Sequence, residues 1–175
     1  MNARMVVFLV GTALLAYASR AYLARPRSYG FFRFWAFTCL LGLVMLNLEA
    51  WFYRPASPIQ LISWVLLLGS AALAVQGFLL LRKRGRPNGS IEATTLLVSS
   101  GVYRRIRHPL YASLLYFAWG VVLKHPSAQS ALLGAAVSVF LFLTARAEEQ
   151  DSRVKFGVAY EAYTAQTKMF IPFLL

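Results

Sequence analysis

Five long apolar runs restrict the fold of this chain more than any other feature of its sequence. They cover residues 5–19, 34–48, 55–81, 109–123 and 126–145. About 20 helical residues cross a hydrocarbon core of roughly 30 Å, and only helices or closed barrels satisfy their backbone polar groups there. The third and fifth runs reach this length alone, and the first two reach it with their flanks. The sequence predicts an all-α polytopic integral membrane protein.

The fourth run is the exception in length. Its 15 residues would span only about 22 Å as a helix, at about 1.5 Å per residue. We therefore expect about five transmembrane or membrane-embedded helices, of which the last two form a hairpin.

Composition supports a membrane protein and argues against a nucleic-acid partner. The chain is 59% hydrophobic and 14% charged, with a formal net charge of +12. Its basic residues flank apolar runs and do not alternate with exposed aromatics, as they would in a nucleic-acid-binding surface. The single cysteine, Cys39, excludes an intrachain disulfide and a cysteine-based zinc site. No metal is expected.

The basic residues predict the orientation in the membrane. With the N-terminus outside, only Arg4, Arg54 and Lys124 of the 18 basic residues fall on the outer side. Because basic loops stay on the cytoplasmic side, we expect an outside N-terminus and an inside C-terminus in a bacterial inner membrane. An alternative is a signal peptide cleaved near residues 16–18, which would invert the topology.

Two polar regions lie on the predicted inner side. The first, residues 82–108, contains the turn formers Gly85, Pro87, Asn88 and Gly89, and residues 94–98 are expected to pack back at the membrane interface. The second begins at Glu148 and is expected to form a cytoplasmic helical tail that ends at Pro172. We therefore divide the chain into a three-helix membrane region, 1–81, and a cofactor-binding region, 82–175.

The stretch GVYRRIRHPLY, residues 101–111, places polar groups directly before an apolar helix. Pro109 suits a first helical turn, so His108 lies at a helix entrance, where free N–H groups and the helix dipole attract anions. Tyr103 and Tyr111 offer aromatic faces to a cation. These residues suit a ligand with both a carboxylate and a cationic centre. The alternative is anchoring to anionic headgroups within an aromatic belt.

An acidic pair, Glu148 and Glu149, follows the last apolar run, with Arg146 just before it. Carboxylates at a membrane boundary suggest a partner, although a solvated helix end is the simpler alternative. Glu49 is expected to be an interfacial acid, and His125 an exposed loop residue.

These two stretches together resemble the isoprenylcysteine carboxyl methyltransferase and phospholipid methyltransferase superfamily of integral membrane enzymes. That family carries G-x-Y-x-x-x-R-H-P-x-Y followed by E-E-(x)6-F-G-x-x-Y-x-x-Y. The matching positions are Gly101, Tyr103, Arg107, His108, Pro109 and Tyr111, then Glu148, Glu149, Phe156, Gly157, Tyr160 and Tyr163.

The resemblance implies S-adenosylmethionine as cofactor and a lipophilic methyl acceptor delivered by the membrane. It places cofactor contacts at Thr95, Leu96, Leu97, Val98, Tyr103, His108, Pro109, Leu110, Tyr111 and Glu148. Glu149 is the candidate base if the acceptor needs one. An arginine that relatives direct toward the substrate corresponds to Arg146, or is replaced at Thr144. Relatives often carry an arginine near the terminal Ile-Pro, where this chain has Gln166, Lys168 and Met169.

Two other functions stay open at this stage. Membrane reductases of the sterol type share a similar R-H-P element, but they usually have asparagine before the tyrosine, where this chain has Leu110. A noncatalytic scaffold whose basic loops bind anionic membrane lipids is the other alternative. The residues do not choose among carboxylate, amine, thiol and hydroxyl acceptors.

Overall fold

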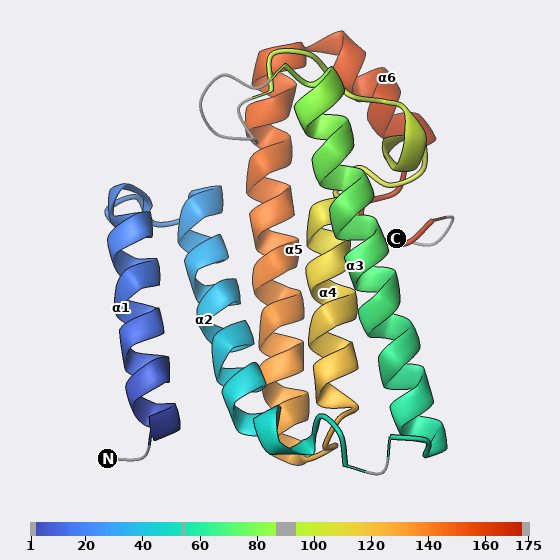
Figure 1. Ribbon diagram of the computed structural model, residues 1–175. Helices are drawn as coiled ribbons and strands as arrows, with labels where there is room; N and C mark the ends of the chain where they lie inside the picture. The colour runs from blue at the N-terminus through green and yellow to red at the C-terminus, as the bar shows by residue number, and fades with distance from the viewer. Residues whose placement is uncertain (1–2, 54, 87–93, 173–175) are drawn as a thin grey trace. The chain divides into compact units, whose positions relative to one another are not determined.

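The computed structural model describes residues 3–53, 55–86 and 94–172, and in this part of the chain it contains helices and no strand. Figure 1 shows the helices. They are α1 (Ala3–Leu23), α2 (Tyr29–Asn47), η1 (Leu48–Ala50), α3 (Pro58–Arg84), η2 (Gly101–Arg104), α4 (Pro109–Val122), α5 (Ala128–Phe156) and α6 (Val158–Gln166). The prediction of an all-α fold is confirmed. Arg54 and the predicted turn residues Pro87, Asn88 and Gly89 lie outside the described residues.

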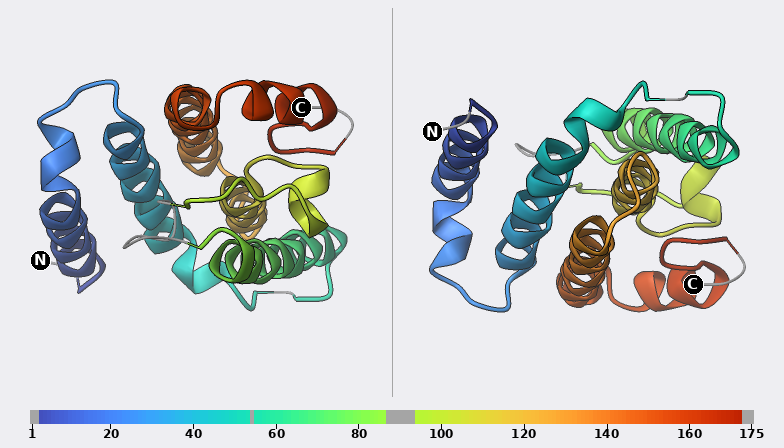
Figure 2. Two further views of the ribbon diagram at one scale, coloured as in Figure 1. Left: turned by 90° about the horizontal axis from the view of Figure 1, so that it is seen from above. Right: turned by 90° about the horizontal axis from the view of Figure 1, so that it is seen from below.

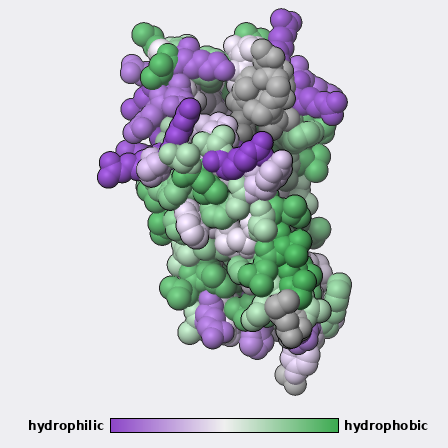
Figure 3. Space-filling view, turned by 90° about the vertical axis from the view of Figure 1, so that its left-hand side faces the viewer, coloured by the Kyte–Doolittle hydropathy of each residue, from purple (hydrophilic) through white to green (hydrophobic). Residues whose placement is uncertain are grey.

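Each of the five apolar runs corresponds to one helix. Among the described residues, α1, α2 with η1, α3 and α5 are long and apolar enough to cross a membrane, whereas α4 has 14 residues. Many large hydrophobic side chains on these helices are exposed, including Leu14, Val65 and Leu132. On the face seen in Figure 3, hydrophobic side chains cover a broad area. Such surfaces suit contact with lipid, and the chain is an integral membrane protein.

The described chain divides into two compact units. Unit 1 contains residues 1–67 and 115–147, and unit 2 contains residues 68–114 and 148–175. Three helices, α3, α4 and α5, have residues in both units. The division into 1–81 and 82–175 made from the sequence is one of function, and it stays a prediction.

In unit 1, α1 and α2 lie side by side (Figure 2). Glycine allows this approach, since a Cβ atom at Gly11 would lie 2.7 Å from a methyl carbon of Leu41. Asn47, at the end of α2, is buried, and its amide nitrogen donates to the Ser130 hydroxyl of α5 at 3.1 Å. One polar pair therefore ties two membrane helices together.

The short helix α4 and α5 form the predicted hairpin. At the far end of α4 and in the turn after it, carbonyl groups lack helical partners, and two side chains of α3 donate to them. The Ser63 hydroxyl donates to the Gly120 carbonyl at 2.7 Å, and the Gln60 amide donates to the Lys124 carbonyl at 2.7 Å. The Lys124 side chain is 2% exposed, with Nζ 3.4 Å from the Trp64 ring centroid.

The C-terminal region differs from the expected single tail in two ways. Helix α5 continues through Glu148 to Phe156, so the first part of the tail belongs to the last apolar helix. The chain turns at Gly157, whose φ of 54° favours glycine. Helix α6 then ends at Gln166 and not at Pro172, because the next residues pair with the backbone of residues 105–108.

The orientation derived from the basic residues stays a prediction that labelling can test. With Cys39 replaced, a cysteine at the exposed position Ala162 should be protected from an impermeant thiol reagent in intact cells. A cysteine at the exposed position Ala56 should react, since it precedes α3 on the side that the basic residues predict to face outward.

The control is the same labelling after the membranes are opened, when both cysteines should react. Reaction at Ala162→Cys and protection at Ala56→Cys in intact cells would reverse the orientation.

Candidate functional site

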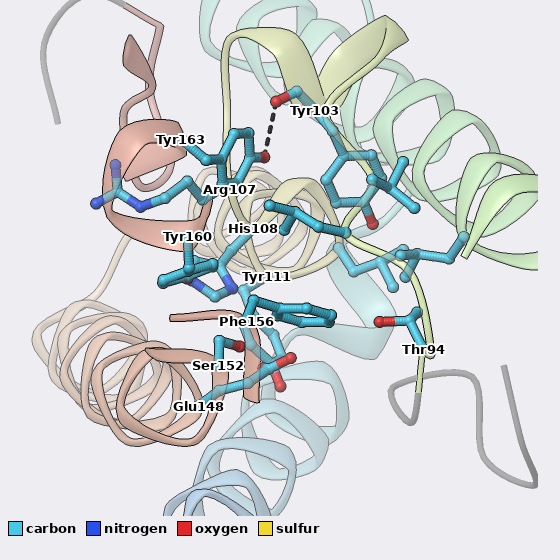
Figure 4. A pocket seen from close by; sticks show the side chains of 14 residues that line it. Thr94, Tyr103, Arg107, His108, Tyr111, Glu148, Ser152, Phe156, Tyr160 and Tyr163 are labelled. Carbon is cyan, nitrogen blue, oxygen red and sulfur yellow. Dashed lines mark hydrogen bonds between the residues drawn. The ribbon is translucent and has the colours of Figure 1, made fainter. Parts of the chain in front are cut away.

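A pocket lies within unit 2, among residues that come from four separate parts of the chain. It contains about 680 Å³ of space not filled by atoms, part of which is open to solvent. Figure 4 shows the side chains around it. They are Leu81, Thr94, Leu97, Val98, Tyr103, Arg107, His108, Leu110, Tyr111, Glu148, Ser152, Phe156, Tyr160 and Tyr163.

The segment 94–98 is held against the end of α3 by glycine. The backbone N–H groups of Thr95 and Leu96 donate to the Gly85 carbonyl at 2.9 and 3.2 Å. A Cβ atom at Gly85 would lie 2.7 Å from the Leu81 carbonyl oxygen and 2.6 Å from a methyl carbon of Thr94. Only glycine fits this close approach, which places Thr94, Leu97 and Val98 in the pocket wall.

The short helix η2 forms another wall of the pocket. It begins at Gly101, whose φ of 62° is a conformation that glycine adopts readily. Tyr103 is buried, and its backbone carbonyl accepts a hydrogen bond of 2.7 Å from the Tyr163 hydroxyl, drawn in Figure 4. Tyr163 of α6 thus holds the backbone of η2 in place at Tyr103.

The chain after α6 is joined to the first motif by a parallel bridge between Ile106 and Lys168. The N–H of Arg107 donates to the Lys168 carbonyl at 2.8 Å, and the N–H of His108 donates to the Met169 carbonyl at 3.1 Å. Phe170 is 2% exposed, and its ring centroid lies 6.2 Å from that of His108. The chain after α6 therefore packs against the residues just before α4.

Arg107 and His108 converge on one carboxylate oxygen of Glu149. The Arg107 Nε donates to Oε1 at 2.7 Å, and the His108 Nε2 lies 3.3 Å from the same oxygen. The guanidinium of Arg107 also donates to the carbonyls of Thr164 and Thr167. The exposed fractions of the Arg107 and Glu149 side chains are 13% and 7%. This is a largely buried, charge-compensated cluster that joins α5, α6 and the first motif.

Glu148 differs from its neighbour because part of its carboxylate is unused. It lines the pocket, and its Oε2 is buried without a hydrogen-bond partner among the described residues. Buried carboxylate oxygens are normally hydrogen-bonded, and leaving one unpaired is costly. An oxygen in this state is suited to accept a hydrogen bond from a ligand.

Three tyrosines give the pocket neutral hydroxyl groups. Burial is the main cause that raises the pKa of Tyr103, Tyr160 and Tyr163 above the usual phenol value. For Tyr160, the negative charge of Glu149 raises the pKa further. These phenols stay protonated at neutral pH and are hydrogen-bond donors or aromatic surfaces, but not bases.

The structure brings together most of the residues that the resemblance marked for the cofactor. Those that line the pocket are Leu97, Val98, Tyr103, His108, Leu110, Tyr111 and Glu148. Thr95 and Leu96 are exposed, and Pro109 is buried at the start of α4; none of the three lines the pocket. Of the two residues predicted to act in catalysis, Glu149 is in the ion-pair cluster and Arg146 is exposed on α5. Their roles stay predictions.

Several pocket residues were not among the predicted site residues. They are Leu81, Thr94, Arg107, Ser152, Phe156, Tyr160 and Tyr163. Four of them stand in the two sequence motifs, so the motifs contained a signal for them. Glu148, Ser152 and Phe156 are spaced by four, which places them on one face of a helix; recognising that α5 continues past Ala145 would have identified Ser152.

Replacing Arg107 tests the ion-pair cluster. Arg107→Gln leaves the buried Glu149 without its main cationic partner, so the variant should lose about 3–5 kcal/mol of stability. Arg104→Gln, three residues away and exposed, should change the free energy of unfolding by less than about 0.5 kcal/mol. Thermal and denaturant unfolding of both variants in detergent measures the difference. Equal stability of the two variants would contradict the role assigned to Arg107.

Comparison with protein families gives one match, to the family model described as phospholipid methyltransferase, over residues 59–157. This is more than half of the 175-residue chain, and it includes the pocket residues from Leu81 to Phe156. Comparison with curated proteins gave no match, and comparison with solved structures gave none. The chain therefore belongs to the phospholipid methyltransferase family of membrane methyltransferases.

Proposed function

We propose that the protein transfers a methyl group from S-adenosylmethionine to a lipophilic, membrane-delivered acceptor, in a reaction most like isoprenylcysteine carboxyl O-methylation. The observation that carries the cofactor is the buried, unpartnered Oε2 of Glu148 in the pocket. Family membership supports methyl transfer.

The pocket residues fit the groups of this cofactor. Glu148 would accept a hydrogen bond from a ribose hydroxyl or from the ammonium group. Leu97, Val98 and Phe156 provide an apolar lining for the adenine ring. The aromatic faces of Tyr103 and Tyr111 suit a positively charged sulfur. When bound, S-adenosylmethionine supplies an electrophilic methyl group.

The state of the basic groups favours an acceptor that is already nucleophilic. Glu149 is paired with Arg107 and His108, and the pocket tyrosines are neutral phenols. A carboxylate or thiolate acceptor needs no base, whereas an amine or hydroxyl does. In this proposal Glu149 positions Arg107 and His108, Arg146 contacts the acceptor, and the pocket aligns the reactants and excludes water.

The proposed location follows from the positive-inside rule. The protein would lie in a bacterial inner membrane with its N-terminus outside, so that the pocket faces the cytoplasm. There it would meet the cofactor from the aqueous side and the acceptor from the bilayer.

Glu148→Gln tests the cofactor assignment. The change keeps the shape of the side chain but removes its charge, so it should weaken S-adenosylmethionine binding by about 1.5–3 kcal/mol, the worth of a hydrogen bond to a charged group. Isothermal titration of the purified protein measures this affinity. Asp151→Asn is the matched control, since Asp151 is exposed on the same helix, and it should bind as the parent does.

The same titration with NADPH separates the methyltransferase from the reductase alternative. We expect S-adenosylmethionine to bind and NADPH not to bind. Binding of NADPH alone would refute the proposed cofactor, and equal affinity of Glu148→Gln and Asp151→Asn for S-adenosylmethionine would remove Glu148 from its site.

Labelled-methyl transfer to a total membrane lipid extract tests the acceptor class. A methyl ester is the expected product, and it should release labelled methanol under mild alkali and be identified by mass spectrometry. An alkali-stable N-methyl product would refute the carboxyl acceptor but leave the methyltransferase assignment in place.

A further inference from the structure

Six of the exposed basic residues in the described part of unit 2 belong to segments that also line the pocket. They are Arg82, Lys83, Arg84, Arg104, Arg105 and Lys155, and we call them the basic collar. The first three follow the pocket residue Leu81 on α3. Arg104 and Arg105 follow Tyr103 on η2, and Lys155 precedes Phe156 on α5. The collar is thus attached to three different walls of the same pocket.

Contacts within unit 2 bring these three segments together. A Cβ atom at Gly101 would lie 2.6 Å from a methyl carbon of Leu80, so the start of η2 packs on the end of α3. On the other side, Thr94 packs on Gly85, directly after Arg84, and the Lys155 ammonium donates to the Thr94 carbonyl. The six collar residues therefore belong to segments that pack together within unit 2.

Little negative charge opposes the collar. In the described residues of unit 2, the exposed carboxylates are Asp151 and Glu161; Glu148 lines the pocket, and Glu149 is already paired with Arg107 and His108. None of the six collar residues forms a salt bridge with a described residue. Uncompensated charge of one sign creates a positive potential that attracts anions.

The position of Arg82, Lys83 and Arg84 indicates which anions they meet. They form the last turn of α3, directly after an apolar stretch that starts at Pro58. That stretch has more than the roughly 20 residues that cross the hydrocarbon core, so the collar begins at the level of the lipid headgroups. Clusters of basic residues directly after a membrane helix are typical of sites that attract anionic lipids.

We propose that the basic collar binds the headgroups of anionic phospholipids, and that this binding draws the mouth of the pocket to the bilayer surface from which the acceptor arrives. The dependence of turnover on these lipids rests on the proposed function, whereas the lipid binding itself does not. Cofactor affinity is independent of the collar, since no collar residue lines the pocket.

The test uses the full chain in nanodiscs of phosphatidylcholine, or of an equal mixture of phosphatidylcholine and phosphatidylglycerol. Native mass spectrometry should show that the protein released from the mixture retains phosphatidylglycerol in preference to phosphatidylcholine. Methyl transfer should be several-fold faster in the mixture, and raised salt should reduce this difference because it screens exposed charges. Inorganic phosphate added to phosphatidylcholine discs should not increase the rate.

Arg104→Gln with Arg105→Gln removes two collar charges and should lower the preference for phosphatidylglycerol roughly thirtyfold. The matched control, Arg20→Gln with Arg25→Gln, removes two exposed charges from α1 and the turn after it, and should keep the lipid dependence of turnover. Both double variants should bind S-adenosylmethionine as the parent does.

Three results would overturn the collar proposal: no lipid preference in the parent, equal losses in the two double variants, or stimulation by inorganic phosphate. A parent that retains phosphatidylglycerol but does not bind S-adenosylmethionine would instead overturn the proposed function, with the lipid site intact.

Discussion

Hydrocarbon offers no hydrogen bonds, and this constraint governs most of the structure. Backbone N–H and C=O groups inside a membrane must pair within the protein, so the apolar runs become helices. Helix α4, with 14 residues, is about 21 Å long and shorter than the roughly 30 Å core. Ser63 of α3 donates to the Gly120 carbonyl near the end of α4, and Gln60 of α3 donates to the Lys124 carbonyl just after it. The short helix is possible because its neighbour supplies the missing donors.

The pocket forms where the backbone leaves this regular pattern. Apart from the short helix η2, residues 94–108 and 167–170 are irregular. They pair backbone groups through a glycine-dependent contact at Gly85 and a parallel bridge at Ile106. Irregular backbone can carry side chains from several directions toward one point, which a straight helix cannot. This explains why the residues that line the pocket come from four separate parts of the chain.

Two adjacent glutamates illustrate how tertiary contacts assign different roles to the same residue type. Glu149 meets a guanidinium and an imidazole and becomes part of a charge-compensated support. Glu148, the next residue on the same helix, lies about 100° around the helix axis and lines the pocket with an unpaired oxygen. Because the two glutamates stand together at a membrane boundary, the sequence predicted that they meet a partner. The direction of each side chain decides that Glu149 finds its partners within the protein, whereas Glu148 faces the pocket.

The sequence by itself determined the membrane character, the helices and the two motifs, because apolar length and local residue order are properties of the chain alone. The five apolar runs predicted α1 to α5, and the motif residues Tyr103, His108, Tyr111 and Glu148 do line one pocket. Sequence reasoning placed the end of the last membrane helix near Ala145, because charged residues follow it. Only the tertiary structure showed that α5 continues to Phe156, since its charged turns are stabilised by partners distant in sequence, above all Arg107 at Glu149. The placement of Ser152 and Tyr160 in the pocket depends on that continuation, and on contacts that no local pattern encodes.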